Sequence, residues 1–303
     1  MPRMNEDTIQ GSKRGSSLSV RGTVSRRSFL GRAAIAAVAT GSPAASTKIT
    51  VVDAHSHLHH HGIPTWSDDD RKLIDAADKL GIDQMWCSTL PPQRPATPES
   101  FRQCNQWTAE AMRRFPGRVV GYCFVNPGYT REALEEIRHC VEDLNFVGIK
   151  LYNDYRADEP VLFPIAELAI RLKVPILQHG GHTSWLSAPQ PRISDASHIG
   201  ELARRYPEAM IICAHAAGGG DWEWTISALR SSPSVYLDTS GSVVDAGVVE
   251  RAVRLLGADR LLFACDMSLT ASVGRIRGAE ISDDDRRKIL GANALNLYAR
   301  RPR

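Results

Sequence analysis

Short apolar runs alternate with amphipathic segments from about residue 49 to the end of the chain. The apolar runs are about five to eight residues long and rich in β-branched side chains, which predicts buried β-strands. The segments between them repeat apolar residues at helical spacing, which predicts α-helices. The predicted strands span residues 49–57, 84–90, 119–126, 147–152, 175–179, 210–215, 235–239 and 260–266. The predicted helices span residues 68–80, 98–115, 130–144, 162–172, 194–206, 222–230, 243–256 and 283–298.

This alternation predicts an α/β fold in which helices cover one sheet of parallel strands. The predicted strands are apolar along their whole length, as parallel strands buried on both faces are. Residues 48–303 have the typical length of a (β/α)8 barrel, and no change of composition divides them. An open doubly wound sheet is the alternative, but no glycine-rich phosphate motif follows the first strand. We therefore predict a single-domain (β/α)8 TIM barrel at residues 48–303.

The first 47 residues differ in composition from the rest and predict an export signal. Arg26 and Arg27 form a twin-arginine motif, and a weakly apolar stretch at 33–39 ends in small residues. That stretch is too short to span a bilayer. We predict a disordered twin-arginine signal peptide and linker at residues 1–47, and export by the twin-arginine translocation machinery to the periplasm or the cell exterior. The alternative is a disordered basic tail.

Charge and composition favour an enzyme that acts on a small molecule. The chain carries a formal net charge of +3, with 43% hydrophobic and 23% charged residues, which is ordinary for a globular protein. Many of the basic residues lie in the first 32 positions, so the barrel gives no reason to expect a nucleic-acid partner. Cys87, Cys123 and Cys213 lie inside apolar strands, which predicts buried thiols. We expect no stable membrane span, and a homodimer is left open.

Polar residues follow several of the predicted strands at the point where each strand ends. His55 and His57 end the first strand and, at i and i+2, point to the same face, where both imidazoles can reach one metal ion. His179, His215 and Asp266 end three later strands in the same way. The carboxyl ends of all strands meet at one face of a barrel. Burying these groups unpaired would cost several kcal/mol each, whereas a metal ion satisfies all of them.

The order of these motifs resembles the amidohydrolase superfamily, and within it the amidohydrolase-2 branch that includes aminocarboxymuconate-semialdehyde decarboxylase. The carriers are Val-Val-Asp-Ala-His-Ser-His, Gly-Ile-Lys-Leu, Pro-Ile-Leu-Gln-His-Gly-Gly, Ala-His-Ala-Ala-Gly-Gly, Leu-Asp-Thr-Ser-Gly, Leu-Leu-Phe-Ala-Cys-Asp and the terminal Gly-Ala-Asn-Ala-Leu-Asn-Leu-Tyr. One departure is Met267-Ser268 after Asp266, where many relatives have a proline two residues after the aspartate. The resemblance implies a metal-dependent enzyme on a (β/α)8 barrel.

The resemblance also implies a role for each strand-end residue. The ligands of one divalent metal would be His55, His57, His179 and Asp266. The expected ion is Zn²⁺, with Mn²⁺ as the alternative. His215 would hold or deprotonate a metal-bound water, and Asp266 would share the handling of its proton. A core histidine with no catalytic role is the alternative for His215.

Three further residues are candidates for contact with substrate. Lys150 ends the fourth strand and can bind a substrate carboxylate; the alternatives are an internal ion pair and a carbamate that bridges two metals. His182 follows His179 by three residues and can reach over the site. Asp238 ends the seventh strand and either lines the mouth of the barrel or bonds to a neighbouring loop.

We predict a metal-dependent hydrolase in which activated water attacks a small ester, lactone or amide. The alternative is a non-oxidative decarboxylase of a small aromatic or unsaturated carboxylic acid, which the same ligands support. Decarboxylation needs a cation for the carboxylate, and Lys150 and Arg192 are the only candidates that stand out in the sequence. The short loop after His57 also favours the hydrolase. A barrel that binds metal or a partner without catalysis is the third alternative, and the full set of strand-end residues argues against it.

Overall fold

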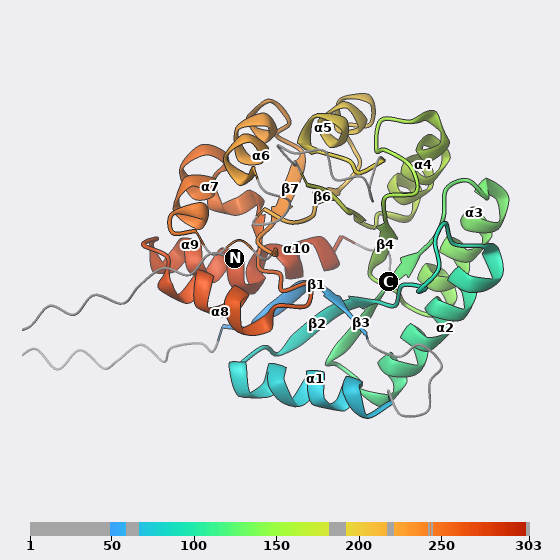
Figure 1. The fold of residues 1–303 in the computed structure, drawn as a ribbon, viewed down its shortest axis with the longest axis horizontal. Coiled ribbons are helices and arrows are strands. Elements are labelled where there is room, and N and C mark those ends of the chain that lie inside the picture. The colour runs from blue at the N-terminus through green and yellow to red at the C-terminus, as the bar shows by residue number, and fades with distance from the viewer. Residues whose placement is uncertain are drawn as a thin grey trace, which may run out of the picture. The chain divides into compact units, whose positions relative to one another are not determined.

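The computed structural model describes residues 49–58, 67–181, 192–216, 221–241, 243 and 245–300. Within them, eight parallel strands form one sheet in sequence order, and the helices lie around it (Figure 1). The strands are β1 (Val52–His57), β2 (Gln84–Ser88), β3 (Val119–Phe124), β4 (Gly148–Leu151), β5 (Ile176–Gln178), β6 (Ile211–Cys213), β7 (Val235–Asp238) and β8 (Leu261–Leu262). The predicted TIM barrel is confirmed.

The helices follow the strands in the order expected of a (β/α)8 fold. The α-helices are α1 (Ser67–Leu80), α2 (Pro98–Arg114), α3 (Thr130–Arg138), α4 (Phe163–Leu172), α5 (Ala196–Arg205), α6 (Trp222–Ala228), α7 (Val248–Leu256), α8 (Leu269–Gly278), α9 (Asp283–Arg287) and α10 (Asn293–Tyr298). Short 3₁₀ or π segments are η2 (His139–Asp143), η3 (Pro160–Leu162), η4 (Leu229–Ser231), η5 (Ala258–Arg260) and η6 (Lys288–Ala292). None of the helices described is long and apolar enough to cross a membrane.

The last strand closes the barrel against the first. The backbone N–H of Ala54 donates to the carbonyl oxygen of Phe263 at 2.9 Å, and Ser56 pairs with Asp266 as a parallel bridge. These contacts lie at the end of β8, where its chain passes β1. The closure brings the carboxyl ends of β1 and β8 together, so that residues 210 positions apart in sequence become neighbours.

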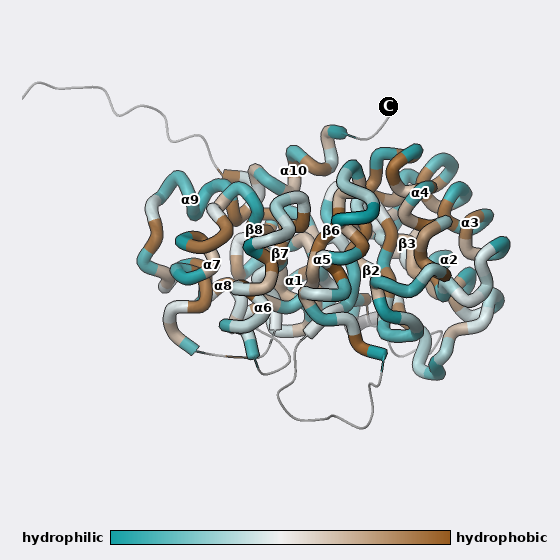
Figure 2. The backbone as a smooth tube through the Cα atoms, turned by 90° about the horizontal axis from the view of Figure 1, so that it is seen from above, coloured by the Kyte–Doolittle hydropathy of each residue, from teal (hydrophilic) through white to brown (hydrophobic). Residues whose placement is uncertain are grey.

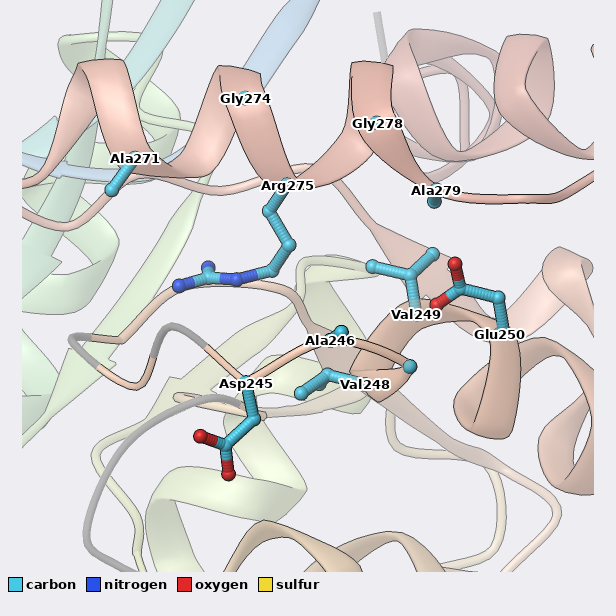
Figure 3. A pocket seen from close by; sticks show the side chains of 11 residues that line it. Asp245, Ala246, Val248, Val249, Glu250, Ala271, Gly274, Arg275, Gly278 and Ala279 are labelled. Atoms are coloured by element: carbon cyan, nitrogen blue, oxygen red, sulfur yellow. The ribbon is translucent and has the colours of Figure 1, made fainter. Parts of the chain in front are cut away.

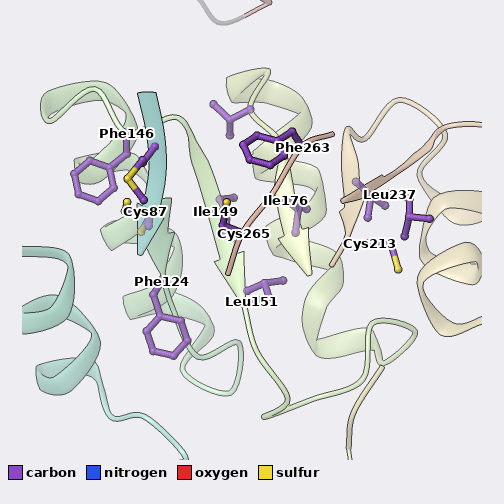
Figure 4. Packing of buried hydrophobic residues seen from close by; sticks show 14 of the residues in the cluster. Cys87, Phe124, Phe146, Ile149, Leu151, Ile176, Cys213, Leu237, Phe263 and Cys265 are labelled. Carbon is purple, nitrogen blue, oxygen red and sulfur yellow. The ribbon is translucent and has the colours of Figure 1, made fainter. Parts of the chain in front are cut away.

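Two apolar layers hold the barrel together. The larger layer lies between the strands and the helices and contains Phe124, Ile149, Leu237 and Phe263, all 0% exposed (Figure 4). The smaller layer fills the inside of the barrel with alternate residues of the same strands, among them Val52, Ala54, Trp86, Tyr122, Leu177, Ile212 and Leu262. This alternation is the two-residue period of β-strands, since successive side chains point to opposite faces. Hydrophobic and hydrophilic residues alternate along the helices around the barrel (Figure 2).

The chain after β8 closes one end of the barrel. Ala294 and Leu297 of α10 pack into the smaller apolar layer. A Cβ on Gly291 would lie 1.9 Å from the carbonyl oxygen of Thr50, so only glycine allows the helix to approach the chain before β1 this closely. The terminal motif of the sequence is therefore a closing element of the fold.

The structure corrects the predicted elements in three places. Helix α8 was not predicted, although its buried residues Leu269, Ser272, Val273 and Ile276 have helical spacing, because two glycines and several small polar residues weaken the pattern. The predicted helix 283–298 is divided into α9, η6 and α10. Most strands are shorter than their apolar runs, so His179, His215 and Asp266 lie just beyond strand ends. The export signal predicted at residues 1–47 lies outside the described residues.

Candidate active site

A shift of register in β1 brings both of its histidines to the inside of the barrel. From Asp53 to Ser56 the chain advances three residues while β2 advances two, from Met85 to Cys87. The buried carboxylate of Asp53 holds this bulge by accepting bonds from the backbone N–H of His55 at 3.1 Å and from the Ser56 hydroxyl at 2.8 Å. It also accepts the Cys265 N–H at 2.9 Å, which joins the bulge to the end of β8. Bulges of this kind often redirect side chains next to active sites.

The hydrogen bonds of His55 determine which of its nitrogens carries the proton. Its Nδ1 lies 2.8 Å from Oδ2 of Asp238, and since a carboxylate accepts, Nδ1 carries the proton. The lone pair of Nε2 therefore faces the Nζ of Lys150 at 2.8 Å. Both partners are 0% exposed, so the pair is shielded from water. Asp238 thus orients His55 with its second nitrogen available to a cation.

His57 and Asp266 face each other in a way that favours a cation between them. The backbone carbonyl of Ser88 lies 3.1 Å from Nδ1 of His57, so this nitrogen carries the proton of the neutral ring. The unprotonated Nε2 then lies 3.2 Å from Oδ1 of Asp266. Burial lowers the pKa of His57, which favours this neutral form. Two electron-rich atoms at this distance repel each other unless a proton or a metal ion lies beside them.

A chain of hydrogen bonds connects the ends of β5, β6 and β7. The Ser240 hydroxyl donates to Oδ1 of Asp238 at 2.6 Å and therefore accepts from Nδ1 of His215 at 2.9 Å. Nε2 of His215 then accepts from Nδ1 of His179 at 3.0 Å. This leaves the lone pair of His179 Nε2, a buried atom with no hydrogen-bond partner in the described part of the chain. An orphaned nitrogen of this kind is characteristic of a missing ligand.

The backbone is strained at two of these residues. His215 has a φ of 68° and Asp266 a φ of 54°, in the left-handed region that ordinary residues avoid. The His215 N–H donates to Oδ1 of Asp238 at 2.9 Å, and the Asp266 N–H donates to the His55 carbonyl at 2.6 Å. These bonds hold the strand ends in this conformation. Such strain costs about 1–3 kcal/mol per residue and is concentrated at functional sites.

The electrostatic environment keeps the imidazoles neutral and Asp266 ionised. Burial and the nearby Lys150 lower the pKa of His55 to about 4, and burial together with His55 lowers the pKa of His215 to about 4. Burial would raise the pKa of Asp266, but the hydrogen bond to His57 and the adjacent histidines outweigh it, and the pKa lies below its ordinary value. Burial lowers the pKa of Lys150 to about 8, although Asp266 and Asp238 oppose the shift. Neutral imidazoles and ionised carboxylates are the forms that bind metal.

These residues fit a divalent metal ion. Ligand atoms of His55, His57 and Asp266 lie within 4.8 Å of one another, and a second such group contains His55, His215 and Asp238. His179 is not in either group, but its ring lies 4.9 Å from that of His215. Imidazole and carboxylate ligands suit Zn²⁺ and Mn²⁺. The donor set and the orphaned His179 nitrogen therefore agree with a metal site at this end of the barrel.

The structure brings most of the predicted site residues together. Lys150 lies inside the barrel against His55, where it can reach a metal-bound group. Asp238 is 0% exposed, and its oxygens are engaged by His55, His215 and Ser240, so its predicted contact with substrate stays a prediction. His182 lies outside the described residues.

Several residues near the site were not predicted from the sequence. Asp53 and Ser240 orient the predicted residues through the bonds given above. Tyr152 stacks on His179, with ring centres 4.1 Å apart, and Arg94 lies over the other face of Tyr152. Asp53 stands in the first motif, which is a signal that could have identified it. Arg94 is in an irregular loop with no motif, and only the fold brings it to the site.

A separate cavity of about 320 Å³ lies between α7 and α8 (Figure 3). Its charged residues are already engaged by other parts of the chain. Arg275 donates to the carbonyls of Thr239, Gly241 and Val243. Asp245 accepts the indole N–H of Trp222 at 2.8 Å, and Glu250 accepts a backbone N–H. The charged side chains of this cavity are therefore used in contacts within the chain.

Known proteins with a similar sequence or fold include aromatic-acid decarboxylases. The chain is 25% identical over 283 residues to a γ-resorcylate decarboxylase from Polaromonas sp. strain JS666, covering 75% of this chain and 86% of that protein. A γ-resorcylate decarboxylase from Rhizobium sp. strain MTP-10005 is 24% identical over 297 residues, with 77% and 90% coverage. A dihydroxybenzoic acid decarboxylase from Polaromonas sp. JS666, solved with manganese and the inhibitor 2-nitroresorcinol, has a TM-score of 0.65 at 22% identity, over 83% of this chain and 97% of that one. The structural likeness shows that the fold is shared.

These relatives contradict the predicted hydrolase of esters, lactones or amides. The curated relatives are decarboxylases, the alternative that the sequence left open. The hydrolase prediction depended on the scarcity of cations at the strand ends and on the short loop after His57. The first of these cues left out Arg94, which belongs to the loop between β2 and α2, lies over Tyr152 and ends no strand.

The pattern characteristic of amidohydrolases matches residues 52–300, from the first residue of β1 to two residues beyond the end of α10. The matched range contains every strand of the barrel and all the strand-end residues described above. It confirms the resemblance that the order of the motifs indicated. The chain belongs to the amidohydrolase family.

Proposed function

We propose that this protein is a metal-dependent, non-oxidative decarboxylase of a small aromatic carboxylic acid. The observation that carries the proposal is the alignment with γ-resorcylate decarboxylases, which spans 75% of the chain and 86% of one such relative. The buried Lys150 adds support, because a carboxylate substrate needs a cation.

We propose that one divalent ion is held by His55, His57 and Asp266, with His179 as the fourth ligand. When bound, such an ion acts as a Lewis acid that stabilises negative charge on substrate oxygens. Zn²⁺, the ion expected from the sequence, and Mn²⁺, present in the Polaromonas structure, are the two ions to compare.

The residues of the chain supply the other requirements of decarboxylation. The bond between the carboxylate carbon and the ring carbon breaks, CO2 leaves, and a proton takes its place on the ring carbon. Lys150 holds the negative charge of the substrate inside the barrel. His215 and Asp266 lie 3.8 Å apart, from Nδ1 to Oδ2, and can hold and deliver the proton. The apolar layer below them excludes water from the reacting groups.

A product analysis tests this proposal. The purified protein, loaded with Mn²⁺ or Zn²⁺, is incubated with 2,6-dihydroxybenzoate, other hydroxybenzoates and a set of lactones, esters and amides. We expect CO2 and the matching phenol from at least one aromatic acid, and no hydrolysis of the other compounds. Acid release from a lactone, ester or amide, without CO2 from any aromatic acid, would overturn the proposal.

We also propose that the protein is exported through the twin-arginine pathway, on the basis of Arg26 and Arg27 and the weakly apolar stretch after them. Cell fractionation of the full-length chain and of a variant with both arginines replaced by lysine tests this. We expect the lysine variant to stay in the cytoplasm. Equal export of both proteins would contradict it.

A further inference from the structure

The loop between β2 and α2 carries a cation to the mouth of the barrel. The loop is fixed by the Asn126 side chain, which donates to the carbonyl oxygen of the buried Ala96 at 2.8 Å. Two residues before Ala96, the guanidinium of Arg94 lies over the ring of Tyr152, 3.6 Å from its centre. Arg94 thus reaches from the loop after β2 to the residue that directly follows β4.

Tyr152 is a rigid support for this guanidinium. Its ring stacks on that of His179, with centres 4.1 Å apart and planes 24° apart. The side chain of Gln178, 0% exposed, donates to the carbonyl oxygens of both Tyr152 and His179 at 3.1 Å, which fixes the two backbones relative to each other. Because Arg94 and His179 are both within contact distance of the ring centre, they occupy opposite faces of Tyr152. The order of the three groups is therefore Arg94, Tyr152, His179.

Stacking leaves the hydrogen-bonding edge of the guanidinium available. Arg94 is an exposed residue, and within the described part of the chain no carboxylate or carbonyl forms an ion pair or hydrogen bond with it. A second arginine lies nearby: Arg192 contacts the ring of Tyr155 and donates to the Asp154 carbonyl at 3.1 Å. Burial raises the pKa of Asp154, and the charges of Arg94 and Arg192 oppose that rise. A planar guanidinium with a free edge is suited to bidentate binding of a carboxylate.

We propose that Arg94 binds a second anionic group of the substrate, apart from the carboxylate that is lost. This inference rests on the decarboxylation proposed above. The reacting carboxylate must lie beside His55, His57 and Asp266, whereas a group bound to Arg94 is separated from His179 by the thickness of the Tyr152 ring. The substrate class is then an aromatic ring that carries two acidic groups, of which the distal one is recognised by Arg94. Tyr152 positions the arginine, and Arg94 determines specificity.

Calorimetric titration of the Mn²⁺-loaded protein with isophthalate and with benzoate tests this recognition. The two acids share a ring and one carboxylate, and only isophthalate has the second. We expect the wild-type protein to bind isophthalate at least about tenfold more tightly than benzoate, as a charge-assisted bidentate pair allows. Arg94→Gln should remove this preference and leave the affinity for benzoate within about twofold. The matched control is Arg204→Gln, on the exposed last turn of α5, which should keep the preference.

Further measurements separate recognition from a structural role. Tyr152→Phe keeps the aromatic support and should keep the preference, and Arg94→Lys should restore only part of it. Thermal unfolding of Arg94→Gln should match that of the wild type. Equal affinity for the two acids in the wild type, or a preference that survives Arg94→Gln, would overturn the inference. Because binding is measured without turnover, either result would leave the decarboxylase proposal unaffected. Conversely, an Arg94-dependent preference without CO2 release would contradict the decarboxylase proposal and not the recognition by Arg94.

Discussion

The two ends of the same eight strands are equally buried but chemically opposite. Inside the barrel, one end is filled by Val52, Val147 and Ala294, and the other by Lys150 and Asp238, all of them 0% exposed. The apolar side chains are satisfied by contact alone. The polar ones are satisfied only by one another, and the network still leaves lone pairs without donors. Burial by itself therefore does not distinguish an apolar core from a functional site. The functional site is distinguished by buried lone pairs that have no hydrogen-bond donor.

Left-handed non-glycine residues occur at both ends of the strands in the described chain. Asn145 and Lys173, in the loops before β4 and β5, are exposed, whereas His215 and Asp266 lie at the polar end among buried charged groups. A region selected for stability would not keep strain and buried charge together. We therefore expect substitutions at the polar end to affect metal binding and turnover, and substitutions at the apolar end to affect stability.

The largest effect on turnover is expected from His57→Asn. This change removes the nitrogen that faces Asp266, so bound metal should fall below half an equivalent and turnover should fall by more than the factor of about 10² typical of losing an orienting partner. Metal analysis and CO2 release measure both quantities. His139→Asn, at an exposed histidine on η2, is the control and should change neither. Full metal content in His57→Asn would remove this residue from the ligand set.

His215→Asn should separate metal binding from proton transfer. We expect metal content near that of the wild type and a fall in kcat of about 10²–10⁴, the usual contribution of a general acid or base. His179→Asn should instead lose metal and activity together. Metal loss in His215→Asn as complete as in His179→Asn would make His215 a ligand, and unchanged turnover would place proton transfer elsewhere.

Asp238→Asn should have a smaller effect, because the residue acts through His55 and His215. An amide in place of the carboxylate disturbs the proton position on His55 Nδ1, and we expect metal affinity to fall by about 10–100-fold. Competition with a chelator of known affinity measures this change. Ser240→Ala, which leaves the bond between Asp238 and His55, should weaken metal binding less. A larger loss of metal affinity in Ser240→Ala than in Asp238→Asn would show that His55 is not oriented through Asp238.

At the apolar end, Leu297→Ala should reduce the free energy of unfolding by about 2–5 kcal/mol, because a buried leucine of α10 is replaced by a cavity. Below its unfolding transition the variant should retain its metal content and the kcat of the wild type. Denaturant titration and kinetics on the same sample give both values. A loss of turnover as large as that of His215→Asn would show that the two ends are not independent.

The smallest effect is expected at the start of α5, far from any predicted ligand in sequence. The hydrogen bond to Asp195 raises the pKa of His198, so its contribution to stability is present below about pH 6.5 and lost as the pH rises through the raised value. Burial would raise the pKa of Asp195, but hydrogen bonds from His198 and Ser197 outweigh it and the pKa is lowered, so its contribution is lost as the pH falls below about 4. His198→Gln should therefore lower the free energy of unfolding by at most about 1 kcal/mol, mainly at pH values above about 4 and below the raised pKa of His198. An equal loss of unfolding free energy at pH 5 and pH 9 in this variant would contradict the ion pair.

The sequence predicted the barrel because apolar runs and helical periodicity are local signals. Each strand lies within its predicted run, and the closing role of α10 was the part that required the structure. Helix α8 was not predicted because its glycines and small polar residues weaken the helical periodicity of its buried residues. The prediction of the fold class thus depended on many short segments that all indicate strands alternating with helices. One weak segment did not change it.

Only those residues of the candidate site that lie at the ends of predicted strands could be identified from the sequence. His55, His57, Lys150 and Asp266 each follow an apolar run, and the fold brings such positions together. Arg94 and Tyr152 are 58 positions apart and meet through loops, whose paths depend on tertiary contacts such as Asn126 to Ala96. The sequence prediction was wrong in the choice between hydrolase and decarboxylase, and the similarity to γ-resorcylate decarboxylases corrected it.

The central claim is that the polar end of the strands is a single-metal site for decarboxylation. The most direct test follows 13CO2 release from carboxyl-labelled 2,6-dihydroxybenzoate, or from the best aromatic acid of the product analysis, while Mn²⁺ is titrated into metal-free protein. The account predicts that the rate of release rises in proportion to bound metal and reaches its plateau at about one equivalent, without dependence on added bicarbonate. A plateau at two equivalents that falls to one in Lys150→Ala, or 13CO2 release by the metal-free protein at the same rate, would contradict it.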